Sequence, residues 1–262
     1  MKKLLTIALA LVLVCALATA SAATKLVIGA SSTPHAEILE AAKDLLAAKD
    51  IELEIVVFDD YVQPNLQLDA GDLDANYFQH IPYLEDFCAQ NGTKLVSAGA
   101  VHYEPMGIYT NLKKAYTMDT IPEKAVIAVP NDPTNEARAL ALLQAQGLIK
   151  MDVAAGQTAT VLDIVENPKN VEIQEFEAAA VPRMLADVDL AVINSNYALE
   201  AGVEVVGTAI AVEGTDITFP NIVAIREGDD RAELKTLVEV LQSEEMVQWI
   251  TSTYGTAVCP TK

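Results

Sequence analysis

Short runs of β-branched residues alternate with amphipathic stretches along most of this 262-residue chain, and no other feature constrains its fold as strongly. The clearest runs indicate strands at residues 25–29, 54–58, 125–129 and 190–193. Strands that alternate with helices form layered α/β structures, because each helix packs back on the sheet and joins two parallel strands. The sequence therefore predicts an α/β fold with mainly parallel sheets.

Helices are expected between these strands. A threonine or aspartate followed directly by proline is typical of a helix start, and this pair begins at Thr33 and at Asp132. Apolar residues at helical spacing predict a further helix at 178–186 and one long helix at 230–254. The first two of these helices would each begin just after a predicted strand has ended.

The predicted elements fall into two α/β units, with no internal repeat and no flexible linker between them. Residues 23–108 together with 222–262 form the first predicted lobe, and residues 109–221 form the second. Extended segments at 106–111 and 219–223 are the predicted crossings between the lobes. The C-terminal helix should then pack on the first lobe, and a cleft should lie between the two lobes.

Residues 1–22 have the composition of a secretory signal peptide. Two lysines precede an apolar run at 4–17, and small residues at 20–22 form a cleavage pattern. Cys15 could carry a lipid anchor, but two bulky apolar residues precede it where a lipoprotein signal needs small ones. We therefore expect an exported protein that loses Cys15 with its signal and is soluble rather than lipid-anchored.

Acidic residues greatly outnumber basic ones, and the formal net charge is −20 at pH 7. A surface of this charge repels phosphate backbones, so a nucleic-acid partner is not expected. Cys88 and Cys259 follow the predicted signal, and both would lie on the first lobe. In an oxidising compartment they could form a disulfide, or they could remain separate thiols.

Aromatic residues concentrate between positions 58 and 116, where several lie at the ends of predicted strands. These are Tyr61, Tyr77, Phe78, Tyr83 and Tyr103. Ligands of open α/β sheets bind at strand ends, although ordinary core packing could also explain the cluster. A cage of aromatic rings suits a flexible apolar or sulfur-containing ligand, because thioether–ring contacts contribute about 0.3–1.5 kcal/mol each.

Arg138 is one of only four arginines and lies early in its predicted helix, where the helix dipole favours anions over cations. This placement indicates a carboxylate partner, whose charge-assisted hydrogen bond would contribute about 1.5–3 kcal/mol. A solvent-facing arginine is the alternative. Asn194 follows a predicted strand and Asn221 lies in the return crossing, so either amide could accept from an ammonium group, unless it only forms a turn.

No catalytic fingerprint occurs in the chain, and no cysteine or histidine spacing is typical of a metal site. We therefore expect neither catalysis nor a metal or other cofactor. The three histidines are His35, His80 and His102, and they are widely separated. One alternative is a receptor that gathers these histidines around a metal ion, and another is a periplasmic hydrolase or racemase.

Five segments are long and uninterrupted: DYVQPN at 60–65, DANYFQH at 74–80, VPNDPTN at 129–135, VLDIVENPKN at 161–170 and AVIN at 191–194. They resemble the NlpA/MetQ family of methionine-binding lipoproteins. The resemblance implies a two-lobed periplasmic-binding-protein fold, type II-like, which closes on an amino acid. It also implies a monomer that captures methionine and delivers it to an ABC permease and its ATPase. Another amino acid or a methionine-containing dipeptide is the alternative cargo.

The resemblance also implies roles for particular residues. The methionine side chain would be surrounded by Tyr61, Phe78, His80 and Tyr83. Arg138 would hold the ligand carboxylate with Asn135 beside it, while Asn194 and Asn221 would contact the polar end. Tyr77 stands where a small residue is more usual, and a ring there could narrow the side-chain pocket.

Overall fold

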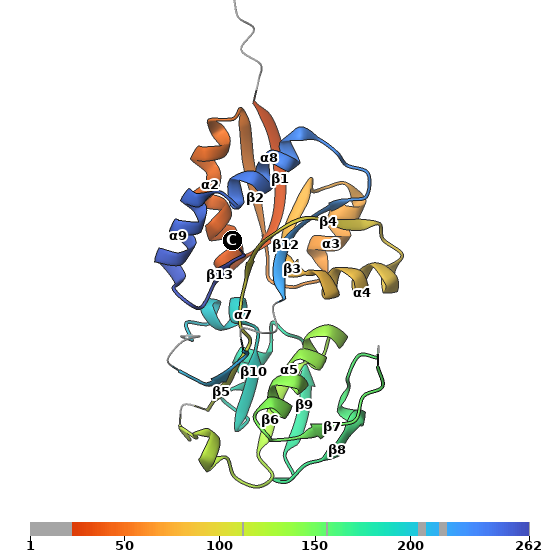
Figure 1. Ribbon diagram of the computed structural model, residues 1–262, viewed down its shortest axis with the longest axis vertical. Coiled ribbons are helices and arrows are strands. Elements are labelled where there is room, and N and C mark those ends of the chain that lie inside the picture. The colour runs from red at the N-terminus through yellow and green to blue at the C-terminus, as the bar shows by residue number, and fades with distance from the viewer. Residues whose placement is uncertain (1–22, 112, 156, 204–207, 215–218, 262) are drawn as a thin grey trace, which may run out of the picture.

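The computed structural model describes residues 23–111, 113–155, 157–203, 208–214 and 219–261. The predicted signal peptide, with Cys15, lies outside the described residues. Two lobes, each built around its own sheet, are stacked along the long axis of the molecule (Figure 1). Within the described ranges, none of the helices combines the length and the apolarity that crossing a membrane requires.

The first lobe is a six-stranded sheet with helices on both faces. Its strands, in the order in which they lie side by side, are β13 (Cys259–Pro260), β4 (Leu95–Tyr103), β12 (Pro220–Arg226), β3 (Ala75–His80), β1 (Thr24–Ser31) and β2 (Ile51–Phe58). Its helices are α2 (Glu37–Ala47), α3 (Gln63–Ala70), α4 (Ile81–Asn91), α8 (Ala232–Leu241) and α9 (Glu244–Tyr254), with a π-helical turn, η1 (Ser32–Ala36), before α2.

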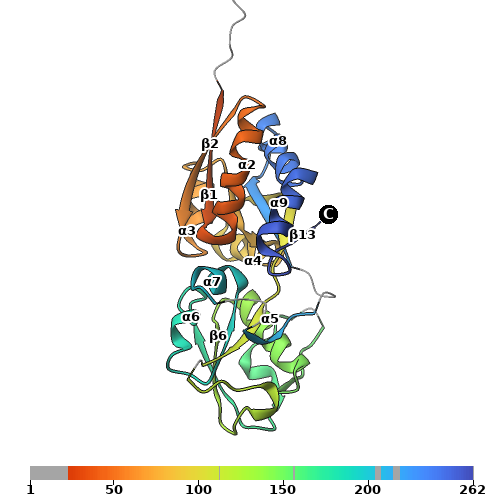
Figure 2. The same ribbon diagram turned by 90° about the vertical axis from the view of Figure 1, so that its left-hand side faces the viewer.

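Side chains of β1 alternate between two cores, as the period of two in a strand requires. Leu26 and Ile28 pack with α2, α8 and α9 on one face, whereas Val27 packs in the core that includes Leu68 and Leu84 of α3 and α4. Helices α2 and α9 lie on one side of the sheet in Figure 1, and Figure 2 brings them to the front together with α8. The C-terminal helices therefore pack on the first lobe.

The second lobe is a five-stranded sheet, again with helices on both faces. Its strands, in spatial order, are β11 (Ala209–Val212), β5 (Gly107–Thr110), β10 (Leu190–Ile193), β6 (Val126–Pro130) and β9 (Glu172–Phe176). Helix α5 (Pro133–Ala145) packs on one face, and α6 (Val181–Met184) and α7 (Ser195–Glu200) pack on the other. A short hairpin, β7 (Lys150–Met151) and β8 (Ile164–Glu166), extends from the lobe.

Both sheets are mixed, whereas the sequence predicted mainly parallel ones. Strands β2, β1 and β3 run parallel, as do β9, β6 and β10, but β12, β4, β13, β5 and β11 all pair antiparallel. The reason lies in the crossings. Strand β12 returns from the other lobe and begins at the edge where β3 and β4 end, since Asn221 pairs with both His80 and His102.

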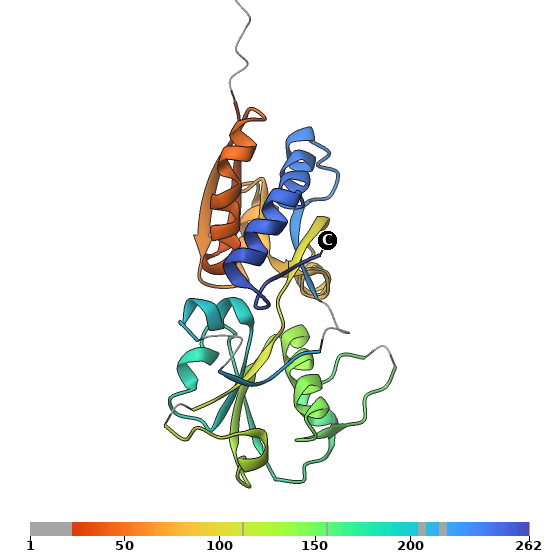
Figure 3. The same ribbon diagram turned by 60° about the vertical axis from the view of Figure 1, so that its left-hand side comes forward.

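The predicted crossings are displaced by a few residues. Strand β4 ends at Tyr103 in the first sheet and β5 begins at Gly107 in the second, so the outward crossing is 104–106 instead of 106–111. Most of the predicted return crossing belongs to β12, which begins at Pro220. The boundaries were misplaced because strands and crossings are both extended, so the periodicity of the sequence does not distinguish one from the other. Figure 3 shows the chain running from β4 through this crossing into the second lobe.

Three predicted helices differ from the structure. The long helix at 230–254 is interrupted, because Ser243 caps a new helix by accepting a hydrogen bond from the Met246 backbone N–H at 3.3 Å. The predicted helix at 178–186 contracts to the four residues of α6. Thr33 is extended, and its hydroxyl donates to the Glu37 carboxylate instead of capping a backbone N–H, so α2 begins only at Glu37.

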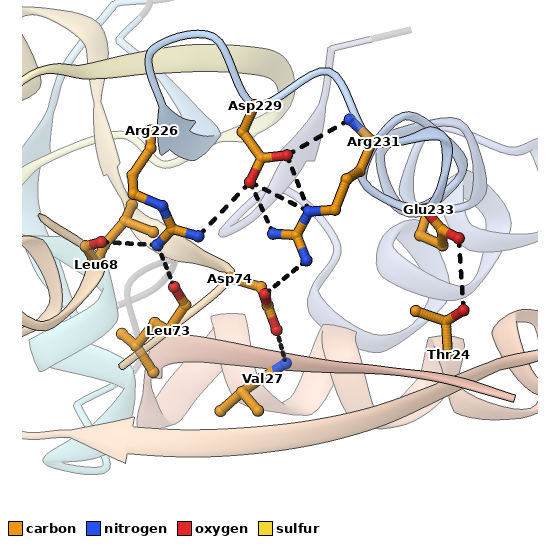
Figure 4. A network of polar contacts seen from close by, with 9 residues as sticks. All are labelled: Thr24, Val27, Leu68, Leu73, Asp74, Arg226, Asp229, Arg231 and Glu233. Carbon is orange, nitrogen blue, oxygen red and sulfur yellow. Dashed lines mark hydrogen bonds and ion pairs between the residues drawn. The ribbon is translucent and has the colours of Figure 1, made fainter. Parts of the chain in front are cut away.

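Two of the four arginines hold the first lobe together (Figure 4). Arg226 donates to the backbone oxygens of Leu68 and Leu73 at 2.8 and 2.5 Å. Arg231 pairs with Asp74 at 2.8 Å, and Asp74 also accepts the backbone N–H of Val27. These contacts tie the β12–α8 loop to β1 and to the turn between α3 and β3.

Cys88 in α4 and Cys259 in β13 both lie on the first lobe, as the sequence predicted. Of the two alternatives left open for them, the structure shows free thiols.

Candidate ligand-binding site between the lobes

A cavity lies between the two lobes, and residues from both lobes and from the outward crossing line it. The lining residues are Tyr61, Phe78, Gln79, His80, Tyr83, Glu104, Asn135, Arg138, Asn194, Ser195, Asn196 and Asn221. All eight residues to which the resemblance gave a ligand-binding role are among them, whereas Tyr77 and Tyr103 are not. Whether these side chains contact a ligand stays a prediction.

The topology explains why residues distant in sequence meet here. Phe78 and His80 end β3, Asn194 follows β10, and the strand β6 leads into the start of α5. The carboxyl ends of parallel strands form one edge of a sheet, where ligands of open α/β sheets bind. In both lobes this edge faces the other lobe, so strand-end residues from the two sheets line a single cavity.

One end of the cavity is aromatic. The Tyr61 ring lies 5.6 Å from the Phe78 ring and 5.8 Å from the Tyr83 ring, centroid to centroid. The Tyr83 hydroxyl donates to the backbone oxygen of Tyr61 at 3.0 Å. The Tyr61 hydroxyl donates to Asn196 Oδ1 at 2.5 Å and so links the lobes. Burial raises the pKa of both tyrosines, which keeps them neutral hydrogen-bond donors.

His80 joins the aromatic end to the polar end. Its Nδ1 accepts the Tyr83 backbone N–H at 3.2 Å, so in the neutral ring Nε2 carries the proton and donates to Asn135 Oδ1 at 3.3 Å. Burial, and then the charge of Arg138, lower the pKa of His80 to about 3. Asn135 is held in turn by Asp132, whose carboxylate accepts from Asn135 Nδ2, and by Asn194, which donates to Asn135 Oδ1 at 2.8 Å. Hydrogen bonds to Asn135 therefore fix the orientation of the His80 and Asn194 side chains, which both line the cavity.

Arg138 projects from α5 and has a carboxylate partner within the chain. Its Nε and Nη2 donate to the Glu213 carboxylate at 2.6 and 2.5 Å, and Nη2 also donates to the Glu104 backbone oxygen at 2.6 Å. The guanidinium carbon lies 4.8 Å from the centre of the Phe219 ring. Among the described residues Nη1 has no hydrogen-bond partner, and Arg138 lines the cavity.

Three more polar groups at this end are available to a ligand. Asn194 Oδ1 and Asn196 Nδ2 are buried and have no hydrogen-bond partner among the described residues. The Glu104 side chain is buried, and burial raises the pKa of its carboxyl, while His35 and Arg138 act in the opposite direction. Buried polar groups are almost always paired in native proteins, so these groups indicate a polar ligand. Together they offer donors for a carboxylate and acceptors for an ammonium group.

Sequence reasoning missed three residues of the polar end: Glu104, Asn196 and Glu213. Glu104 stands just after a strand, two residues beyond His102, and that position could have drawn attention to it. Asn196 is close in sequence to Asn194, and the two side chains point to the same cavity because a helix begins between them. Glu213 carries no local signal, since its partner lies 75 residues away.

Tyr77 does not narrow the cavity. It is fully buried in the core of the first lobe, where its hydroxyl contacts His102 Nδ1 and its ring lies edge-on to His35 at 4.8 Å. Tyr103 pairs with Cys259 of β13 and does not line the cavity either. Alternation along β3 explains why Tyr77 lies in the core, because the neighbouring residues Tyr77 and Phe78 point to opposite faces of the sheet.

The chain is similar in sequence to a named family and to several of its members. Residues 26–262 match the model of the NlpA lipoprotein family. The D-methionine-binding lipoprotein MetQ of Escherichia coli is 44% identical over 207 residues, covering 77% of this chain and 76% of that protein. The membrane lipoprotein TpN32 of Treponema pallidum is 42% identical over 203 residues, covering 78% of this chain and 75% of that protein.

Solved structures resemble the whole two-lobed fold. A putative lipoprotein from Ruminococcus gnavus superposes with a TM-score of 0.88 at 51% identity, covering 92% of this chain and 100% of that one. A nutrient-binding protein from Burkholderia cenocepacia, solved with methionine bound, gives a TM-score of 0.86 at 42% identity, covering 90% of this chain and 100% of that one.

Proposed function

The chain belongs to the NlpA lipoprotein family, and we propose that it is an extracytoplasmic solute-binding protein that captures methionine for an ABC importer. Relatives at 41–44% identity are named as D-methionine-binding lipoproteins, and a structural neighbour was solved with methionine bound. One observation in this chain carries the proposal. One cavity between the lobes has, at one end, donors and acceptors without partners among the described residues, and aromatic rings at the other end.

The polar end would bind the α-amino and α-carboxyl groups. Arg138 Nη1 and Asn196 Nδ2 are the donors for the ligand carboxylate, and the Asn221 amide nitrogen is a third. The Glu104 carboxylate and Asn194 Oδ1 are the acceptors for the ammonium group. A zwitterion pairs with both sets at once, whereas a simple amine or a simple carboxylic acid leaves one buried set unpaired.

The aromatic end would surround the thioether. Tyr61, Phe78 and Tyr83 form three sides of the space and His80 closes it toward the polar end. Sulfur–ring contacts of about 0.3–1.5 kcal/mol each favour methionine over an amino acid whose side chain is purely aliphatic.

Capture would proceed by closure of the two lobes about the crossings. The cavity has a volume of about 20 Å³, which is room for roughly one water molecule, so the lobes must move apart to admit an amino acid. Tyr61–Asn196 and His80–Asn135 are hydrogen bonds between the lobes that form on closure. A ligand that contacts both lobes favours the closed form, because only that form gives it all its contacts.

The closed, loaded form would be presented as a monomer to a membrane permease, which an ATPase drives. No chemistry is done on the ligand. We place the protein in the cell envelope, where the lipoproteins of this family belong, and we propose a soluble form in preference to a lipid-anchored one. The mass of the protein purified from the envelope tests this last point, because an acylated Cys15 adds the mass of its lipid.

Calorimetric titration tests the cargo. The mature chain, unfolded and refolded to strip bound ligand, is titrated with L-methionine, D-methionine, norleucine, a Gly-Met dipeptide and isoleucine. We expect micromolar or tighter binding of at least one methionine enantiomer and weaker binding of norleucine, which lacks the sulfur. No heat with either enantiomer, together with clear binding of the dipeptide or isoleucine, would overturn methionine as the cargo and leave the receptor class intact.

A further inference from the structure

His35, His102 and Glu104 form a buried cluster beside the ligand cavity. Their metal-ligating atoms lie within 4.8 Å of one another, and all three residues are at most 5% exposed. Glu104 Oε1 lies 2.7 Å from His102 Nε2 and 3.4 Å from His35 Nε2. Asn221 Oδ1 lies 3.0 Å from the same His35 nitrogen. Two imidazole nitrogens and two oxygens therefore converge on one small volume.

The fold brings these residues together from three places in the chain. His35 lies in the η1 turn that follows β1, and His102 lies near the end of β4. Glu104 is two residues further along the extended chain, so it points to the same side as His102. Asn221 begins β12 and pairs with His102 across the sheet. His80 does not join them, since its ring contacts Asn135 on the other side of the cavity.

The second nitrogen of each ring has an oxygen partner. His35 Nδ1 lies 2.7 Å from Ser31 Oγ, and His102 Nδ1 contacts the Tyr77 hydroxyl. Metal-ligating histidines usually donate their other ring N–H to such an oxygen, which directs the lone pair of Nε2 to the metal.

We propose that His35, His102 and Glu104 bind a divalent transition-metal ion of the zinc class, with Asn221 Oδ1 or water as the fourth ligand. Zinc sites with two histidines, one carboxylate and one further position are common, at metal–ligand distances of about 2.0–2.2 Å. Tetrahedral ligands at that radius lie about 3.3–3.6 Å apart, so the side chains need shift by less than about 1 Å. The ion also adds positive charge next to the buried Glu104 carboxylate, beyond that of Arg138.

The metal site shares two residues with the ligand cavity, because Glu104 and Asn221 line both. A metal ion at Glu104 reduces the negative charge available to an ammonium group in the cavity. Binding of the ion and of an amino acid are then coupled, and each weakens the other by the same factor. The ion would in this way act as an inhibitor of capture.

Zinc titration of the chelator-treated mature protein tests the site, with Cys88 and Cys259 replaced by serine so that no thiol binds the metal. We expect one Zn²⁺ per chain, at least tenfold weaker binding in His102→Gln and in Glu104→Gln, and unchanged zinc affinity in the matched control His80→Gln. Zinc should also weaken binding of the amino acid in the chain that carries only the two cysteine replacements. Circular dichroism checks that each variant is folded.

X-ray absorption of the zinc-loaded chain gives a readout that does not depend on variants, and it should show two imidazole ligands. An absence of stoichiometric zinc, or equal loss of zinc binding in all three variants, would mean that the cluster is only a hydrogen-bonded network that orients Glu104. Amino-acid binding is measured on the same chelator-treated protein. Failure of the metal proposal therefore leaves that result unaffected.

Discussion

Arg138 and Glu213 form an ion pair in which both side chains are 7% exposed, and two hydrogen bonds of 2.6 and 2.5 Å join them. The same Glu213 carboxylate accepts the Met106 backbone N–H at 2.7 Å. Glu213 thus fixes the guanidinium against the outward crossing, and Nη1 has no hydrogen-bond partner among the described residues. The sequence predicted a carboxylate partner for Arg138. Glu213 is such a partner within the chain, and the carboxylate of the proposed ligand would be a second one.

Replacing Arg138 by alanine should lower both ligand affinity and stability. Methionine affinity should fall at least tenfold, because a charge-assisted hydrogen bond is lost. The free energy of unfolding should fall by about 3–5 kcal/mol, because Glu213 stays buried without its partner. Chemical denaturation and calorimetry measure the two effects. A double variant, Arg138→Met with Glu213→Gln, should regain most of the stability and none of the affinity. If it regains affinity, Arg138 does not bind the carboxylate.

Glu104→Gln should weaken methionine binding selectively. The substitution keeps the shape of the side chain but removes the charge that faces the ligand ammonium group, so a loss of at least tenfold is expected. The matched ligand is 4-(methylthio)butanoate, which has the carboxylate and thioether of methionine without its amino group. Its affinity should change little. Equal losses for both ligands would assign Glu104 a structural role in place of ammonium binding.

Sequence reasoning found those site residues that carry a local signal. Asn194 follows a strand, Arg138 stands against its helix dipole, and the rings of Tyr61 and Phe78 lie near strand ends. Strand ends are recognisable as ligand positions because parallel strands bring their carboxyl ends to one edge of the sheet, where ligands bind. Residues whose role depends on distant partners could not be found in this way. Glu213 meets Arg138 only after the chain has formed five further strands, two α-helices and a short 3-10 helix.

Dependence on distant parts of the chain also explains where the predicted fold differs from the structure. The interruption at Ser243 was missed because apolar residues keep helical spacing through α8 and α9, so only the cap marks the break. The antiparallel strands were missed because their direction depends on the path of the chain between lobes, which periodicity does not record. Alternation of strands and helices still predicted the layers correctly, since that signal is local.

Tyr61→Phe should weaken methionine binding about fivefold. The Tyr61 hydroxyl holds Asn196 Oδ1 at 2.5 Å and thereby turns Asn196 Nδ2 to the cavity. A lost hydrogen bond of about 1 kcal/mol corresponds to this factor. Tyr83→Phe is the control, because the hydroxyl that it removes bonds, among the described residues, to the Tyr61 backbone oxygen alone, and Asn196 stays in place. A larger effect of Tyr83→Phe would argue that ring position, and not the Asn196 amide, limits affinity.

Acidification should destabilise the ligand-free protein between pH 6.5 and 5.5. Burial is the main cause that lowers the pKa of His35 to about 4 and those of His80 and His102 to about 3. Below pH 6.5 the unfolded chain therefore binds protons at these residues while the folded chain does not. Stability must then fall with pH, by up to about 1.4 kcal/mol per pH unit for each histidine.

The window is bounded below because burial raises the pKa of Glu104 and of Asp132, and such carboxyls take up protons more readily in the folded protein and stabilise it as the pH falls further. Urea denaturation at pH 6.5, 6.0 and 5.5, with a chelator present, measures the slope. His80→Gln removes one of the three groups and should reduce the slope by about a third, whatever its effect on overall stability. A slope near zero in the unsubstituted chain would mean that the three histidines take up protons as readily in the folded protein as in the unfolded chain, which would contradict the lowered pKa values of these rings.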